Sequence, residues 1–96
     1  MTDSEREILG LAIERYGAEA QTDMAIEEMS ELTKALLKHR RAYKNFKAVP
    51  GKYITENVLE EMADVQIMLD QLYMIFGEPI IMRNRKIERL KERLET

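Results

Sequence analysis

Two short acidic stretches carry the residues most able to do chemistry. EEMSE, which begins at residue 27, is followed thirty-three positions later by EEMAD. Within each stretch two acids lie three positions apart, Glu28 with Glu31 and Glu61 with Asp64. Residues three apart on a helix are neighbours on one side, so each stretch would present a pair of carboxylates. If the two helices pack together, four carboxylates can converge.

The chemistry of such a cluster follows from its charge. Four carboxylates within a few ångströms repel one another unless protons or a cation neutralise them. A hard divalent ion suits oxygen ligands, and Mg²⁺, which keeps waters and takes phosphate oxygens, suits them best, with Mn²⁺ as a substitute. The alternative is a solvated acidic face. Charge balance argues against that alternative, because no lysine or arginine lies between Lys52 and Arg83 and ordinary surfaces mix both signs.

Other kinds of metal site lack their ligands. The chain has no cysteine and one histidine, His39, which excludes thiolate sites and imidazole clusters. A di-iron centre in a helix bundle needs Glu-x-x-His on two helices, whereas Leu36 lies three residues before the single histidine. Any metal must therefore be held by oxygen.

Length and composition indicate one globular domain. Ninety-six residues, 45% of them hydrophobic and 34% charged, suit a single domain spanning residues 1–96. No apolar run approaches a membrane span, and the amino terminus carries acids where a secretory signal carries bases, so we expect no membrane partner and a cytoplasmic protein. A net charge of −3 gives no general attraction to nucleic acid.

Apolar residues recur at steps of three and four, which predicts helices throughout. We expect four, over residues 4–16, 18–40, 55–76 and 79–93, with a loop over 41–54 around the single Pro-Gly step. Thr2 with Glu5 is spaced as a capping box, and Thr55 can cap the third helix. The fold class is therefore all-α, with a four-helix bundle-like protomer. Two acidic stretches are too few for a helical solenoid.

Each expected helix has an apolar stripe that would face the core. The predicted inner positions are Ile8, Leu9, Ala12 and Tyr16; Ala25, Ile26, Met29, Leu32 and Leu36; Val58, Met62, Val65, Leu69, Leu72 and Phe76; and Ile80, Ile87, Leu90 and Leu94.

Basic residues follow both acidic stretches. Lys34, Lys38, Arg40 and Arg41 come after the first, and a longer set crowds the last helix, interrupted by two glutamates. Most of these bases are expected to form solvated faces with local ion pairs. Some, with Lys38 as a candidate, could instead meet the phosphates of a metal-bound polyphosphate.

The two acidic stretches resemble a family signature. EEMSE followed by EMAD is similar to the Glu-Glu-x-x-Glu and Glu-x-x-Asp motifs of the MazG-like all-α nucleoside triphosphate pyrophosphohydrolases, a superfamily that includes dimeric dUTPases and dCTPases. The later NRKIER, residues 84–89, resembles a segment of Asn, Lys, an aromatic residue and Arg in the MazG branch, with Ile87 at the aromatic position. The resemblance spans roughly residues 18–90.

The resemblance implies an activity and its residues. The reaction would be Mg²⁺-dependent hydrolysis of a nucleoside triphosphate between the α and β phosphorus atoms, giving a monophosphate and pyrophosphate, in a homodimer or homotetramer. By position, the metal ligands fall on the four acids chosen above by geometry. The phosphate and nucleotide contacts fall on Asn84, Lys86 and Arg89.

Some roles stay open. Glu27, or one of the four ligands, could accept the proton of the attacking water, while Glu60 is expected to be a surface acid. Gln21 lies two helical turns before Glu28 and could read a base edge, or could be a plain exposed residue. The alternatives to an enzyme are a metal-nucleotide-binding module without turnover and a helical protein-interaction module. A nucleic-acid reader is weaker, because the bases are interleaved with acids.

Overall fold

The computed structural model describes the backbone of residues 1–46 and 52–96 and the side chains of residues 1–42 and 54–96. Four helices and no strand form within this part of the chain, which confirms the predicted all-α class. The helices are α1 (Asp3–Tyr16), α2 (Ala18–Phe46), α3 (Lys52–Phe76) and α4 (Ile80–Leu94).

Helix α1 begins where the sequence predicts. The Thr2 backbone N–H donates to Glu5 Oε1 at 3.2 Å, and the Glu5 N–H donates to Thr2 Oγ1 at 3.1 Å, which completes the capping box. Hydrogen bonds that the side chain and the backbone N–H of Thr2 donate to the Glu5 carboxylate lower the pKa of Glu5. The helix ends at Gly17, whose φ of 93° lies in the region that favours glycine.

The predicted loop over residues 41–54 is wrong at both ends. Helix α2 continues to Phe46 and α3 already begins at Lys52, so Thr55 lies inside α3 and does not cap it. Residues 41–46 contain no glycine or proline, and their bases are favourable near the carboxyl end of a helix. The Pro-Gly step, on which the loop prediction rested, lies outside the described residues.

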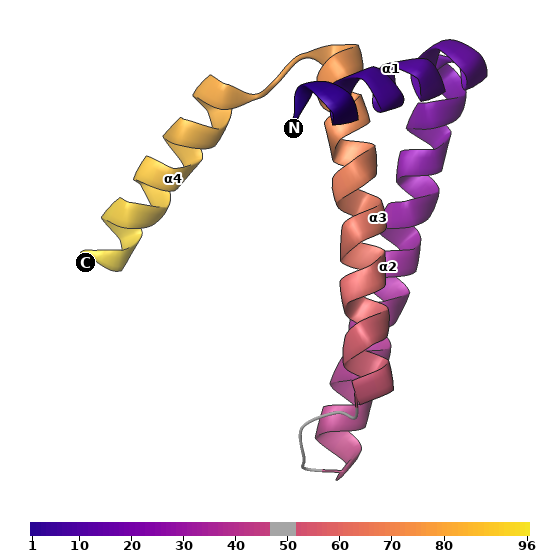
Figure 1. Ribbon diagram of the computed structural model, residues 1–96. Coiled ribbons are helices and arrows are strands. Elements are labelled where there is room, and N and C mark those ends of the chain that lie inside the picture. The colour runs from indigo at the N-terminus through magenta and orange to yellow at the C-terminus, as the bar shows by residue number, and fades with distance from the viewer. Residues whose placement is uncertain (47–51) are drawn as a thin grey trace.

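Helices α2 and α3 form an antiparallel hairpin, and α1 lies across its upper end against both (Figure 1). The α2 stripe that faces α3 consists of buried or partly buried residues at steps of three and four, namely Gln21, Ala25, Glu28, Leu32 and Ala35. The corresponding α3 stripe contains Val58, Glu61, Val65, Met68 and Leu72. We call the contact between these two stripes the seam.

Part of the predicted core belongs to the stripe next to the seam and not to the seam itself. Ala25 is buried as predicted, but Met29 and Leu36 are 39% and 46% exposed, and Met62 is 50% exposed. Ile26 and Phe76, also predicted to face inward, are exposed. The spacing fitted two neighbouring stripes, and the structure buries the one that contains small alanines, which let two helices approach closely. In one copy, the hairpin therefore leaves large apolar side chains uncovered.

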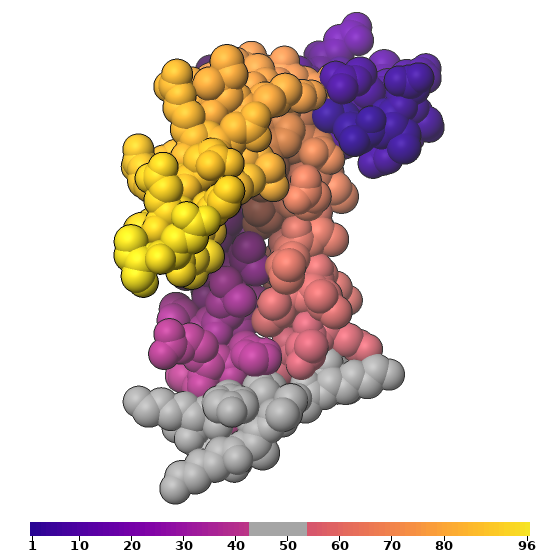
Figure 2. All heavy atoms as spheres, turned by 90° about the vertical axis from the view of Figure 1, so that its left-hand side faces the viewer, coloured from indigo at the N-terminus to yellow at the C-terminus, as the bar shows by residue number. Residues whose placement is uncertain are grey.

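Helix α4 departs most from the predicted bundle. It packs on none of the other described helices and descends apart from the hairpin in Figure 1, and Figure 2 views the molecule from the side on which α4 lies. Ile80, Ile87, Leu90 and Leu94 are exposed by 59%, 46%, 47% and 77%, so their predicted inward positions are wrong within one copy. The short connection after Phe76 contains Gly77, with a φ of 109°, and turns α4 away from α3.

Helix α1 covers the hairpin only in part. Leu9 and Ala12 are partly buried, as predicted, whereas Ile8 and Tyr16 are 61% and 62% exposed. Among the described helices, none combines the length and the hydropathy needed to span a lipid bilayer.

Candidate metal centre

Three carboxylates from the two acidic stretches meet at the seam. Glu28 of α2 and Glu61 and Asp64 of α3 each offer an oxygen, and these three oxygens lie within 4.8 Å of one another. Glu28 and Glu61 are partly buried, and Asp64 is exposed. The seam positions on either side of Glu28 are Ala25 and Leu32. Two ionisable groups thus occupy seam positions where a helix pair ordinarily packs apolar residues.

The spacing inside each stretch explains this placement. In an antiparallel helix pair, residues one position after a seam residue project to the same flank from both helices, and residues three positions after it turn to the other flank. Met29 and Met62 therefore share one flank. Asp64 shares the other with the position of Glu31. Each stretch thus supplies a seam acid, a methionine on an apolar flank and an acid on a polar flank.

The pKa values of both seam glutamates are raised. Partial burial raises the pKa of Glu28 above its ordinary value, and the charges of Asp64, Glu61, Glu27 and Glu31 raise it further. Burial likewise raises the pKa of Glu61, with added contributions from Asp64, Glu31 and Glu60. Both groups therefore favour either a proton or a neighbouring cation.

These raised pKa values predict how metal-free stability depends on pH. Between the ordinary pKa of a glutamate and the raised values of Glu28 and Glu61, the folded protein binds more protons than the unfolded chain. The free energy of unfolding should therefore fall as the pH rises from about 4.5, the ordinary pKa of a glutamate, through the raised pKa values of these two groups. Urea titrations with a chelator present, followed by circular dichroism, would measure it.

The Glu28→Gln, Glu61→Gln double variant is the control for this prediction, because it removes both titrating groups and should flatten the dependence. The lowered pKa of Glu5 acts at lower pH and with the opposite sign, since its contribution is lost as the pH falls. Equal slopes in the wild type and the double variant would show that folding does not raise the pKa values of the seam acids.

Glu31 lies outside the cluster of three. Lys34 Nζ lies 3.4 Å from Glu31 Oε1, one helical turn away. The charge of Glu31 nevertheless raises the pKa of both seam glutamates, so Glu31 lies close to them. An exposed ion pair contributes about 0–1 kcal/mol, so the pair with Lys34 holds Glu31 only weakly. The structure thus brings together three of the four predicted ligands.

The first acid of each stretch lies outside the seam. Glu27 and Glu60 are exposed on α2 and α3, and each raises the pKa of the seam glutamate that follows it. Glu60 is thus a surface acid, as predicted. Glu27 lies next to the centre without belonging to the cluster of three, and its role as a base stays a prediction.

Lys38 lines a hollow of about 350 Å³ between the later part of α2 and the first turns of α3. The other lining residues come from α3 and are Ile54, Glu56, Asn57 and Glu60. Asn57 was not among the predicted site residues, although it precedes Glu61 by four positions and so lies one helical turn away on a similar side. This four-residue spacing is the sequence feature that could have identified Asn57.

Gln21 is buried, so the alternative of a plain exposed residue is wrong. It is 8% exposed, and its Nε2 donates to Gln71 Oε1 at 2.7 Å across the seam. Gln71, 3% exposed, also donates to Met68 Sδ at 3.6 Å. No pattern in the sequence predicted this buried amide pair. It stays a prediction that Gln21 recognises a nucleotide base. Its side-chain amide already donates a hydrogen bond to Gln71.

The three residues predicted on the last helix do not meet the acids within one copy. Asn84 and Arg89 line a hollow of about 430 Å³ on α4, together with Ile81, Arg85, Glu88 and Glu92. Lys86 is exposed on the same helix. Because α4 packs on none of the other described helices, none of these side chains is held at the metal centre by its own chain.

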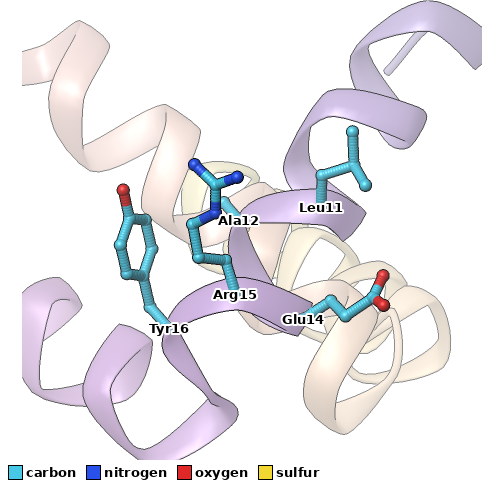
Figure 3. A pocket seen from close by; sticks show the side chains of 5 residues that line it. All are labelled: Leu11, Ala12, Glu14, Arg15 and Tyr16. Atoms are coloured by element: carbon cyan, nitrogen blue, oxygen red, sulfur yellow. The ribbon is translucent and has the colours of Figure 1, made fainter.

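A larger hollow, of about 520 Å³, lies along α1 (Figure 3). It is lined by Leu11, Ala12, Glu14, Arg15 and Tyr16. Its lining offers a single carboxylate and comes from one helix, so it lacks the convergent groups that mark the seam. We therefore place the candidate site at the acids.

The donor set fits a hard divalent cation. Three carboxylates from two helices can bind such an ion through oxygen and leave its other positions to water or phosphate, as Mg²⁺ prefers. No protein-family model, curated protein or solved structure matches the chain. Membership of the MazG-like superfamily therefore rests on the sequence motifs and stays a prediction.

Proposed function

We propose that the protein hydrolyses a nucleoside triphosphate between its α and β phosphorus atoms, in a Mg²⁺-dependent reaction that yields a nucleoside monophosphate and pyrophosphate. The observation that carries the proposal is the placement of Glu28 and Glu61 within the seam, with Asp64 completing a group of oxygens within 4.8 Å of one another. Ionisable groups at such positions cost stability. A function that needs them there explains why they are present.

Each part of the centre has a role in this reaction. Mg²⁺ bound by the three carboxylates would neutralise them and the triphosphate and stabilise the negative charge that develops during hydrolysis. Glu31, released from Lys34, would complete the ligand set. A carboxylate not engaged with the ion, Glu27 among them, would accept a proton from the attacking water.

The bond changes balance without a further reactant. The oxygen of the water forms a bond to the α phosphorus, and the bond from that phosphorus to the bridging oxygen breaks. The electron pair of the broken bond leaves with the pyrophosphate. Lys38, in the hollow beside Asn57 and Glu60, would offset part of the negative charge of the pyrophosphate.

Product identity tests the reaction type. Purified protein should be incubated with millimolar Mg²⁺ and each common or modified nucleoside triphosphate in turn, and the products separated by anion exchange. We expect monophosphate and pyrophosphate in equal amounts from at least one triphosphate, and none when a chelator replaces the metal. Nucleoside diphosphate with orthophosphate, or no turnover of any triphosphate, would contradict the proposal.

A second candidate is a helical interaction module, favoured by the large exposed side chains of Met62 on the hairpin and Leu90 on α4. The two candidates differ in how they respond to metal. Absence of turnover together with a Mg²⁺-dependent rise in melting temperature would indicate a metal-nucleotide-binding module. Absence of both would indicate an interaction module whose acids are only solvated.

A further inference from the structure

The buried amide pair crosses the seam at a fixed spacing from the acids. Gln21 Nε2 donates to Gln71 Oε1 at 2.7 Å, and the two residues are 8% and 3% exposed. Glu28 lies seven residues after Gln21 on α2, and Asp64 lies seven residues before Gln71 on α3. Seven residues are close to two helical turns. In an antiparallel hairpin, the register that joins the two glutamines therefore also sets Glu28 opposite Asp64.

The spacing of the seam residues does not fix this register by itself. On both helices they recur at alternating steps of three and four, a pattern that repeats every seven residues. Sliding α3 along α2 by seven residues would therefore bring an equivalent set of positions together.

The lengths of the two helices do not fix the register either. Nineteen residues separate Lys52, the first residue of α3, from Gln71. The same number after Gln21 leads to Arg40, which therefore lies level with the start of α3. Helix α2 continues six residues past Arg40, to Phe46. A slip of α3 toward this extension would keep the overlap of the two helices nearly unchanged.

The charges along the seam favour that slip. In the observed register, Glu28 offers an oxygen within 4.8 Å of oxygens from Glu61 and Asp64. A slip of seven residues would move Glu61 to the level of Lys38 and Gln71 to the level of Glu28. It would thus replace repulsion between carboxylates by attraction to a base and by a hydrogen bond. The observed register therefore needs a contact that opposes the slip.

The amide pair is such a contact, because it is both buried and directional. A buried amide that loses its partner costs more than the hydrogen bond itself contributes. Gln71 also donates to Met68 Sδ at 3.6 Å on its own helix, which orients its side chain. Among the described residues, no buried side-chain nitrogen or oxygen lacks a hydrogen-bond partner. The glutamines therefore satisfy each other fully only in the observed register.

We propose that the hydrogen bond between Gln21 and Gln71 fixes the register of α2 against α3, so that these two glutamines are positioning residues for the acids of the seam. A buried polar residue at one core position specifies the register of a coiled coil in the same way. The role fits the burial of Gln21 and requires no contact with a substrate. The inference does not depend on the proposed reaction or on bound metal, and the register is measured without either.

A distance between two spin labels reports the register directly. The chain has no cysteine, so Glu19→Cys on α2 and Leu59→Cys on α3 place one label on each helix, at exposed residues outside the cluster of acids. Dilution with unlabelled protein removes distances between chains. Double electron–electron resonance should give a single distance when both glutamines are present. A slip of seven residues displaces the labels by about 10 Å along the helix axis.

Gln21→Leu should add a second, longer distance between these labels. The change leaves Gln71 without its partner across the seam, and the slip that brings Gln71 level with Glu28 supplies a new one. Met68→Leu is the matched control, because it alters a neighbouring seam residue and keeps the amide pair, so it should keep the single distance. An unshifted single distance in Gln21→Leu, or an equal shift in Met68→Leu, would overturn the proposal.

A relocated pair tests the same idea without leaving a buried amide unpaired. Gln21→Leu combined with Glu28→Gln sets two glutamines opposite each other only after the slip, because positions 21 and 28 are seven residues apart on the seam. The longer distance should then dominate, and circular dichroism should show the helix content of the wild type. A relocated variant that keeps the original distance, or that loses its helices, would contradict the assignment.

Discussion

Replacing Glu61 by glutamine is expected to lower kcat for triphosphate hydrolysis by about a hundredfold or more, the size of effect seen when one group that stabilises charge in the transition state is lost. Glu61 lies in the seam, within 4.8 Å of oxygens from Glu28 and Asp64. Glutamine has nearly the same shape but no charge, so it weakens metal binding without opening a cavity. Steady-state kinetics on the best triphosphate measures the loss.

Glu60→Gln is the matched control, because Glu60 is the adjacent acid on the same helix but lies outside the cluster. It should change kcat by less than about tenfold, because Glu60 is exposed, would not hold the ion, and only lines the hollow beside Lys38. Circular dichroism should show the same helix content in both variants. Activity that survives Glu61→Gln, or an equal loss in Glu60→Gln, would contradict the assignment of the metal centre.

Millimolar Mg²⁺ is expected to raise the melting temperature of the wild type by about 5 °C or more, if the ion is present well above its dissociation constant. The physical reason is that partial burial, together with the neighbouring like charges, disfavours the ionised forms of Glu28 and Glu61 and raises their pKa values. A bound cation offsets this cost only in the folded state, where the acids are partly buried and close together. Differential scanning calorimetry at neutral pH, with and without Mg²⁺, measures the shift.

The Glu28→Gln, Glu61→Gln double variant should respond in the opposite way. Without metal it should melt above the wild type, because the like charges are gone, and Mg²⁺ should raise its melting temperature little. A monovalent salt at the same ionic strength controls for general screening. A wild type that shows no specific response to Mg²⁺ would indicate that the acids form a solvated cluster and not a metal centre.

The sequence predicted that acids of the two stretches would meet, and three of them do, because the signals for this are mostly local. The capping box of Thr2 and Glu5 depends on residues three apart, and so do the two acid pairs. The meeting of Glu28 with Glu61 and Asp64 needed one further condition, the packing of α2 against α3, which their apolar stripes indicated.

The sequence could not show which apolar stripe faces the seam. Ala25 belongs to the buried stripe and Met29 to the neighbouring one, yet both recur at steps of three and four. The difference comes from how closely two backbones can approach, which is a property of the pair. The buried amide pair of Gln21 and Gln71 could not be predicted either, because the two residues are fifty positions apart and meet only when the helices pack.

The position of α4 could not be predicted from the sequence, for a different reason. Its apolar stripe predicted that Leu90 would be buried, and in one copy it is 47% exposed. A periodic pattern indicates that a helix face needs cover but does not say which molecule provides it.

The most direct test of the proposed reaction is to carry out hydrolysis with Mg²⁺ in water enriched in the heavy isotope of oxygen and to analyse both products by mass spectrometry. Attack at the α phosphorus places the heavy oxygen in the nucleoside monophosphate and none in the pyrophosphate, and this is the result we expect. Label confined to pyrophosphate or to orthophosphate, or an absence of labelled product, would contradict the proposed reaction.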